Sequence, residues 1–559
     1  MTHPRRDEWT FVVADSLEKV FPDQRPRAMN DSIPLCAFAG ETVSFQIAFL
    51  PPTITSSDGI RPLLVDVEAT GGATSTLAAV ELVPCTLPAF EEHDGGYLRD
   101  APGLYPDLLR PLPDDGIVPF AGGWRAVWVT VTAPDGLDGA ITITVTFRDS
   151  TTGGVLFTAD VDIAVSSLRL PALDIVNTHW FHCDGLADYY GVEVLSEEHW
   201  AAIARFLAKA TEMSANSVLT PTWTPPLDTP VGLTRRPVQL IDIEEIEGEY
   251  RFGFDKLERW MGMCRDIGIE YLEIAHLFTQ WGARCAPAIY VRTESGLEHR
   301  FGWHTPATDP AYRRLLEQLL PALLATLAQH WDLDKVIFHI SDEPHGREML
   351  ATYTAARAVV EDLLTGRTII DALSDYAFYE SGVVKTPVIA TDAVGPFLEN
   401  GVDDFWLYYC VAQDVAVANR FVAMPSTRNR VIGSQLFALG AKGFLHWGYN
   451  FYNSSFTARP VDPFLDLSSG GRFPAGDAFL VYPGPGGVPF ESIRFRVLAE
   501  AMTDHRLMQL VREEAGTDAV RDIVDPDGTL SLTSYSDDPD HYRRVRAELA
   551  AHVTGVAVR

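Results

Sequence analysis

The sequence predicts an N-terminal β-sandwich, then a (β/α)8 TIM-like barrel and a short C-terminal region. Two observations support this prediction. Short runs with the strand period of two fill the first part of the chain, between turns rich in Gly, Pro, Asp and Ser. Apolar strand-like segments then alternate with helical ones, and eight such steps over roughly 330 residues suit a barrel. We place the domains at 1–170, 171–512 and 513–559.

The sandwich prediction depends on alternation between apolar and polar residues. The runs at 41–49, 126–131 and 141–147 are the clearest, with Val, Ile, Phe and Trp separated by Thr, Ser and Gln. Residues of this kind favour strands with one buried face. We expect this domain to brace the barrel.

Eight segments are predicted as the barrel strands: 177–182, 216–223, 271–277, 335–341, 367–374, 387–393, 404–410 and 443–450. Helical periodicity fills most of the intervals, at 196–213, 254–267, 311–331, 347–364 and 428–439, and continues at 491–511. The intervals at 376–386 and 394–403 are short, so stunted helices are expected there. A charged helix at 538–553 ends the predicted elements.

The chain is strongly acidic, with 76 Asp and Glu residues against 44 Lys and Arg, a formal net charge of -32. Nucleic acid is therefore not an expected partner, since its phosphates would be repelled. We find no signal peptide or membrane-spanning run. The six cysteines are scattered without a CxxC pair, which favours reduced thiols and a cytoplasmic location.

Asp342 and Glu343 are adjacent at the end of an apolar run that Pro344 stops. Burying two acids together is costly unless they have a function. On a regular strand they would point to opposite faces, but a break at Pro344, with Gly346 next, would let both reach one ligand. The alternative is that the pair caps the helix that follows, where negative charge suits the helix dipole.

Residues at the carboxyl ends of barrel strands converge on one mouth. There the sequence supplies acids, histidines and aromatic residues that suit the hydroxyls and apolar faces of a sugar. The predicted substrate contacts are Trp447, Tyr449, Trp406, Tyr408, His276, Trp223, Asp392, His182 and Asp184. Several of these aromatic residues have an alternative place in the barrel interior. Gln280 and Trp281 follow the third strand, and Asp371 and Asp375 belong to the fifth.

The seventh and eighth predicted strands contain no Glu, the usual nucleophile of a retaining glycosidase. Two adjacent acids suit substrate-assisted hydrolysis instead, in which the 2-acetamido oxygen of the sugar attacks the anomeric carbon. We assign Glu343 as general acid and base, and Asp342 as the carboxylate that orients the acetamido group. A hydroxyl from Tyr449 or Tyr408 is expected at the acetamido carbonyl, and Trp447 and Trp406 around its methyl group.

Three motifs carry a family resemblance: residues 179–184 (HWFHCD), 338–344 (FHISDEP) and 443–453 (GFLHWGYNFYN). They resemble the domain-of-unknown-function 4091 group, which is similar to glycoside hydrolase family 123, the exo-β-N-acetylgalactosaminidases. The resemblance covers roughly residues 170–510. It implies a sandwich and a TIM-like barrel, a substrate-assisted retaining mechanism, and catalysis by Asp342 and Glu343.

Two alternatives stay open. A conventional retaining β-glycosidase would act on sugars without an acetamido group and use Asp392 or Asp375 as nucleophile. A non-catalytic carbohydrate-binding protein would use the barrel mouth as a lectin site. No metal-binding spacing is present, so neither a metal nor another cofactor is expected. The expected partner is a small carbohydrate or glycan, with a homo-oligomer left open.

Overall fold

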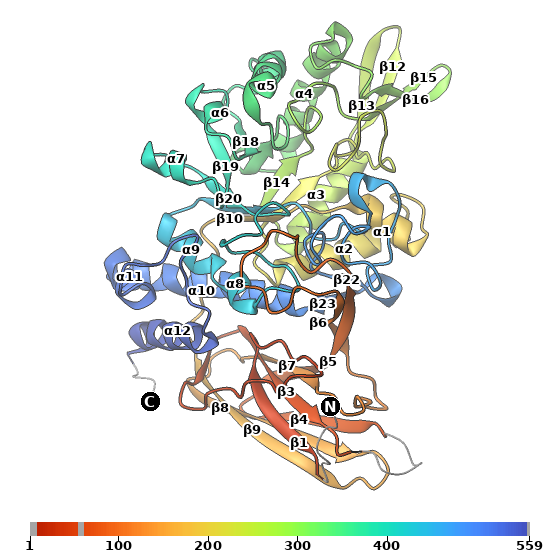
Figure 1. Ribbon diagram of the computed structural model, residues 1–559. Coiled ribbons are helices and arrows are strands. Elements are labelled where there is room, and N and C mark those ends of the chain that lie inside the picture. The colour runs from red at the N-terminus through yellow and green to blue at the C-terminus, as the bar shows by residue number, and fades with distance from the viewer. Residues whose placement is uncertain (1–7, 54–60, 556–559) are drawn as a thin grey trace.

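The computed structural model describes residues 8–53 and 61–555. A β-sandwich forms the lower end of the molecule in Figure 1, and the barrel lies above it. The C-terminal helices lie between the two, on one side. Within the described residues, no helix is long and apolar enough to cross a membrane.

The sandwich pairs a seven-stranded sheet, in the order β1-β3-β7-β5-β6-β23-β22, with a four-stranded sheet, β2-β9-β8-β4. The N-terminal strands are β1 (Thr10–Asp15), β2 (Leu35–Phe38), β3 (Thr42–Leu50), β4 (Leu63–Ala69), β5 (Thr74–Cys85), β6 (Gly103–Pro111), β7 (Arg125–Thr132), β8 (Gly139–Asp149) and β9 (Val155–Ser166). β22 (Tyr482–Pro483) and β23 (Pro489–Ser492) come from beyond the barrel strands and extend the larger sheet beside β6. The alternating residues Phe45, Ile47, Val127 and Val129 are buried in the core between the sheets.

All eight predicted barrel strands are confirmed, and they close into a parallel barrel in chain order. They are β10 (Val176–His179), β11 (Ser217–Thr220), β14 (Tyr271–Ile274), β17 (Val336–Phe338), β18 (Thr368–Leu373), β19 (Thr386–Ala390), β20 (Trp406–Tyr408) and β21 (Gly443–His446). Most are shorter than predicted, because the hydrogen-bonded pairing with the neighbouring strands ends before the apolar run of the sequence does. β17, for example, stops four residues before Asp342.

The helices between the strands are α1 (Cys183–Tyr190), α2 (Glu197–Thr211), α3 (Asp255–Ile267), α4 (Pro310–His330), α5 (Gly346–Val360), α6 (Ala377–Glu380), α7 (Gly395–Glu399), α8 (Ser426–Arg430) and α9 (Ile432–Leu439). α6 and α7 have 4 and 5 residues, as the short intervals predicted. The chain ends in α10 (Ile493–Ala515), α11 (Thr517–Val524) and α12 (Pro539–Thr554).

A second small sheet, which the sequence pattern did not reveal, is inserted around β14. It has the order β13-β12-β15-β16 and consists of β12 (Asp242–Ile246), β13 (Glu249–Gly253), β15 (Ile289–Thr293) and β16 (Gly296–Phe301). Figure 1 shows it at the end of the molecule away from the sandwich. Its strands are half exposed and rich in charge, so they lack a continuous apolar run.

Trp406 fills the lower part of the barrel interior. It belongs to an apolar cluster with Ile370, Val388 and Tyr408. Gly443 on the neighbouring strand makes room for its indole, because an added Cβ there would lie 2.2 Å from Trp406 Cδ2. A larger residue at 443 would therefore displace the indole or the strand.

A buried ion pair joins the sandwich to the barrel. Both oxygens of Asp107 on β6 accept hydrogen bonds from the Arg494 guanidinium on α10, each at 2.8 Å. The Tyr482 hydroxyl donates to the same carboxylate at 2.5 Å. Because Asp107 and Arg494 are almost fully buried, this paired contact fixes the position of the two parts.

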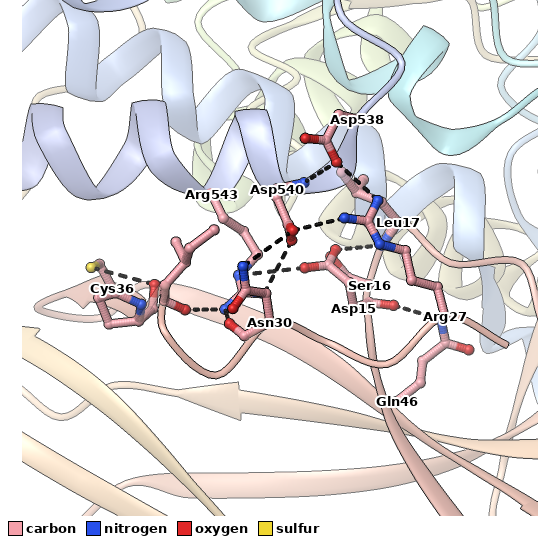
Figure 2. A network of polar contacts seen from close by, with 12 residues as sticks. Asp15, Ser16, Leu17, Arg27, Asn30, Cys36, Gln46, Asp538, Asp540 and Arg543 are labelled. Atoms are coloured by element: carbon pink, nitrogen blue, oxygen red, sulfur yellow. Dashed lines mark hydrogen bonds and ion pairs between the residues drawn. The ribbon is translucent and has the colours of Figure 1, made fainter.

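A second polar network holds α12 against the sandwich (Figure 2). Arg27 donates to Asp538 at 2.8 Å and to Asp540 at 2.7 Å. Arg543, which lies on α12, in turn donates to the Asn30 carbonyl of the sandwich at 2.8 Å. The last long helix is thus bound to the loop between the first two strands of the chain.

Candidate active site

A cavity of about 220 Å³ lies at the carboxyl ends of the barrel strands. Trp180, just after β10, Ala372 on β18 and Leu445 on β21 supply apolar walls. Asp342 and Glu343 also line it, as Tyr408 and Trp447 do. This volume lies below the roughly 300–1,000 Å³ of pockets for drug-sized ligands, so the cavity suits a single sugar residue better than a chain of them.

The chain turns sharply at the two acids, and this turn brings both carboxyl groups to the cavity. Glu343 has φ 44°, in the left-handed region that residues other than glycine rarely adopt. The residue before Glu343 is also held in place, because the Asp342 carbonyl accepts a hydrogen bond from the Trp281 N–H at 2.8 Å. Strain of this kind is typical of functional sites, where surrounding contacts enforce it.

The structure does not support the alternative in which Asp342 and Glu343 cap the helix that follows them. α5 begins at Gly346, whose N–H donates to Asp375 Oδ2 at 3.0 Å. The residue at the cap position, His345, makes no side-chain cap hydrogen bond. Asp375, one of the two alternative nucleophiles, therefore serves the helix end and does not line the cavity.

Hydrogen bonds distinguish the two acids. Glu343 Oε1 accepts from the Tyr408 hydroxyl at 2.7 Å and from the Cys410 thiol at 3.8 Å. Burial raises the pKa of Glu343, and these two donors lower it in part. Burial also raises the pKa of Asp342 well above its usual range, with further contributions from the negative charges of Glu343 and Asp371. Because burial opposes ionisation of both acids and the charge of Glu343 opposes that of Asp342, the pair favours keeping one proton.

Asp371 anchors the segment that leads to this pair. Its carboxylate accepts from the N–H groups of Ile340 and Ser341 at 3.0 and 3.1 Å, and from the Tyr353 hydroxyl. Burial raises the pKa of Asp371 to about 7, although those donors and His339 oppose the shift. The sequence placed Asp371 at a strand end, but this support of the neighbouring backbone was not predicted.

Glu273 is a fully buried carboxylate in the middle of β14, beneath the cavity. It accepts from Ser217 Oγ at 2.6 Å, Trp180 Nε1 at 3.0 Å and His339 Nε2 at 3.1 Å. Burial alone would raise its pKa, but the hydrogen bonds outweigh that effect and lower it. Glu273 thereby holds the Trp180 indole in the cavity wall. An acid inside an apolar strand is a signal that the sequence analysis did not use.

Trp447 lines the cavity and is held from behind. Its Nε1–H donates to Asp477 Oδ2 at 2.8 Å, and burial raises the pKa of Asp477 to about 7. His182 Nε2 lies 2.8 Å from the Trp447 carbonyl, outside the cavity lining. Asp184 is paired with Arg235 at 2.6 Å. His182 and Asp184 therefore support the wall and do not reach the cavity themselves.

Four predicted aromatic contacts lie elsewhere. Trp406 is in the barrel interior, below Tyr408, and the Tyr449 hydroxyl donates to the Phe206 carbonyl at 2.9 Å, away from the cavity. Trp223 donates to the His276 carbonyl at 2.8 Å. The His276 ring stacks on His339, with the ring centres 4.5 Å apart. All four are buried by packing that sequence alternation alone does not locate.

Asp392, the other alternative nucleophile, accepts from Gln413 at 2.9 Å and does not line the cavity. A carboxyl group that the sequence analysis missed does line it: Asp228, in the loop after β11. Burial raises the pKa of Asp228 to about 6. No strand end marks this position, and the surrounding prolines read only as a loop.

Comparisons with known proteins agree with this architecture. Residues 180–511 match the model of the glycoside hydrolase 123 catalytic domain. A family 123 glycoside hydrolase from Clostridium perfringens, whose structure was analysed for glycolipid glycan hydrolysis, superposes with a TM-score of 0.70 at 13% identity, over 98% of this chain and 97% of that one.

Two other structures are much less similar. β-Glucuronidase 2 from Bacteroides uniformis aligns with a TM-score of 0.30 at 12% identity, over 85% of this chain and 48% of that one. A Ruminococcus gnavus β-glucuronidase aligns with a TM-score of 0.31 at 8% identity, over 89% and 68%. No curated protein sequence matches the chain. The family model covers more than half of the chain, which therefore belongs to glycoside hydrolase family 123.

Proposed function

We propose that this glycoside hydrolase removes terminal β-linked N-acetylgalactosamine, with retention of configuration, by substrate-assisted catalysis. The observation that carries the proposal is the placement of two adjacent carboxyl groups, Asp342 and Glu343, on one cavity of about 220 Å³. A cavity of this size suits exo action on one terminal sugar.

In the first step Glu343 donates its proton to the glycosidic oxygen as the bond to the anomeric carbon breaks. The acetamido oxygen of the same sugar forms the new bond to that carbon and gives an oxazolinium intermediate. Water then attacks the anomeric carbon from the face that the leaving group occupied. Glu343 takes the proton of that water, and the acetamido group is restored. The configuration is retained because two inversions occur.

Asp342 orients the acetamido group by accepting a hydrogen bond from its N–H. The first step needs the one proton of the pair on Glu343 and a carboxylate at Asp342. An acetamido N–H arriving at Asp342 stabilises its carboxylate and so favours the proton on Glu343. The substrate thereby produces the protonation state that the first step needs.

The cavity supports this arrangement and disfavours a carboxylate nucleophile. Asp375 and Asp392 lie outside the cavity lining. Among the described residues, the remaining acid in that lining is Asp228, which accepts from the Thr457 N–H at the mouth. Apolar walls from Trp180, Leu445 and Trp447 suit the acetamido methyl group.

The preference for the galacto configuration rests on the family resemblance of the sequence motifs. A cytoplasmic location is part of the same proposal, and the six cysteines, all free, support it. Imported glycan fragments would then be the natural substrates.

The test is hydrolysis of an aryl 2-acetamido-2-deoxy-β-galactoside and of the aryl β-galactoside, by the wild type and by Glu343→Gln. We expect turnover of the acetamido substrate alone, and loss of about a hundredfold or more in kcat for the variant with its proton donor removed. An aryl gluco epimer measures the sugar preference. Equal turnover of both galactosides would contradict the acetamido mechanism, and failure of every glycoside in a panel would favour the lectin alternative.

A further inference from the structure

A second cavity, the floor cavity, lies at the amino ends of the barrel strands, at the opposite end of the barrel from the acid pair. It has a volume of about 570 Å³. Four residues that begin barrel strands line it: Tyr271, Thr368, Thr386 and Trp406. Among the described residues, none lines both the floor cavity and the catalytic cavity. The proposed reaction therefore gives the floor cavity no role.

Four positive side chains line the floor cavity. Arg357 comes from α5, and Arg367, Lys385 and Lys442 lie directly before β18, β19 and β21. In a chain with 76 acidic and 44 basic residues, four cations at one cavity need an explanation. The simplest would be that acids of the protein pair with each of them.

The lysines of the chain contradict that simple explanation. The chain has six lysines, all within the described residues. Four of their ammonium groups have partners: acids for Lys209, Lys256 and Lys335, and the Val422 carbonyl for Lys19. The two ammonium groups without a hydrogen bond or ion pair to a described residue are those of Lys385 and Lys442, and both lysines line the floor cavity.

The two arginines are also available to a ligand. Within the part of the chain that the structure describes, Arg357 makes no side-chain hydrogen bond or ion pair, and Arg367 donates to the Leu333 carbonyl at 3.3 Å. A guanidinium has five N–H donors, so both arginines keep donors free. The floor cavity thus presents four cations that no ion pair neutralises, which favours an anionic ligand.

Acidic and aromatic side chains restrict the kind of anion that fits. Asp334, Glu361 and Asp404 line the same cavity, and none of these described residues forms an ion pair with its cations. Their carboxylates would repel a polyanion but accept hydrogen bonds from hydroxyl groups. Trp406 and Tyr271 supply aromatic surface, which suits the C–H face of a sugar ring. The lining therefore offers separate partners for one anionic group and for several hydroxyls.

We propose that the floor cavity binds a phosphorylated monosaccharide, with the phosphate held by its lysines and arginines and the hydroxyls held by its carboxylates. The volume of about 570 Å³ lies in the range of sites for small ligands. A phosphate suits several separate cations, because its oxygens accept charge-assisted hydrogen bonds in different directions. The proposal does not depend on the proposed function, since the lining of the floor cavity lies outside the catalytic cavity.

The test is isothermal titration calorimetry of the full chain at constant ionic strength, with glucose 6-phosphate as the probe. Inorganic phosphate and glucose probe the two halves of that ligand separately. We expect saturable binding of glucose 6-phosphate, weaker binding of inorganic phosphate, and no binding of glucose. Lys385→Gln and Lys442→Gln should each weaken binding of the ester by roughly two- to fivefold, and the double variant by roughly tenfold.

Lys256→Gln is the matched control. It removes the same charge from a partly exposed lysine that lies outside the floor cavity, so the affinity for glucose 6-phosphate should not change. An equal loss in this control would reduce the effect to the overall charge of the protein and overturn the proposal.

Absence of saturable binding by the wild type, or binding that survives both lysine substitutions, would also overturn it. Inorganic phosphate bound as tightly as the ester would contradict the sugar half of the ligand. A nucleoside monophosphate bound more tightly would contradict the choice of a monosaccharide. Because every readout is binding, loss of this site leaves the proposed hydrolase intact, and failure of the hydrolase leaves this site intact.

Discussion

Replacing Tyr408 with Phe tests the role of Glu343 through the pH dependence of catalysis. The Tyr408 hydroxyl donates to Glu343 Oε1 at 2.7 Å and stabilises its ionised form. A hydrogen bond to a charged group contributes about 1.5–3 kcal/mol. Since about 1.4 kcal/mol corresponds to one pH unit, its loss should move the basic limb of the kcat/KM profile upward by roughly 1 to 2 pH units. The direction is upward because the acid pair then keeps its proton to higher pH.

The assay is the profile of kcat/KM against pH for an aryl 2-acetamido-2-deoxy-β-galactoside. Tyr409→Phe is the matched control, because the buried Tyr409 hydroxyl lies 3.5 Å from Asn429 and outside the cavity lining. A lost substrate contact at Tyr408 would lower activity by the same factor at every pH. A basic limb that stays in place or moves downward in Tyr408→Phe, or one that moves equally in Tyr409→Phe, would refute the reasoning.

Three further predictions concern stability. Gly443→Ala should lower the free energy of unfolding by about 1–3 kcal/mol in chemical denaturation, because the new Cβ meets Trp406, while Gly395→Ala, with open space around it, should have little effect. Asp107→Asn should cost about 3–5 kcal/mol in the same assay, since Arg494 is left buried without its charged partner. Asp371 has a folded pKa of about 7 against an ordinary 3.8, so its contribution is complete below about pH 4 and is lost as pH rises through 7. Asp371→Asn should flatten the fall in unfolding free energy between pH 4 and 8, by up to about 4 kcal/mol, and an unchanged slope would contradict the shift.

The sequence predicted the barrel because its strands are buried on both faces and therefore read as apolar runs. The acid pair stood out for the same reason, since two carboxylates at the end of such a run need an explanation. The position of each inward-pointing side chain along the barrel axis was not predictable. Trp406 and Tyr408 share one face of β20, yet only Tyr408 reaches the cavity, because the indole of Trp406 occupies the space over Gly443.

Gln280 and Trp281 were expected beyond the third strand and do line the cavity, but the rest of its mouth escaped prediction for a different reason. Asp228 and Phe456 belong to loops whose paths depend on hydrogen bonds between segments more than fifty residues apart. Their backbone conformations are ones that these residue types rarely adopt. Local sequence preferences therefore pointed away from the conformations that bring these residues together.

Substrate participation is the central claim, and the N-acyl group is the most direct probe of it. The measurement is kcat/KM for a series of aryl 2-acylamido-2-deoxy-β-galactosides with N-acetyl, N-fluoroacetyl, N-difluoroacetyl and N-trifluoroacetyl groups. Each fluorine withdraws electrons from the carbonyl oxygen, so nucleophilic attack by that oxygen predicts a steep and continuous fall in rate along the series. A flat series, with all four substrates hydrolysed equally well, would contradict the account and require a nucleophile from the protein.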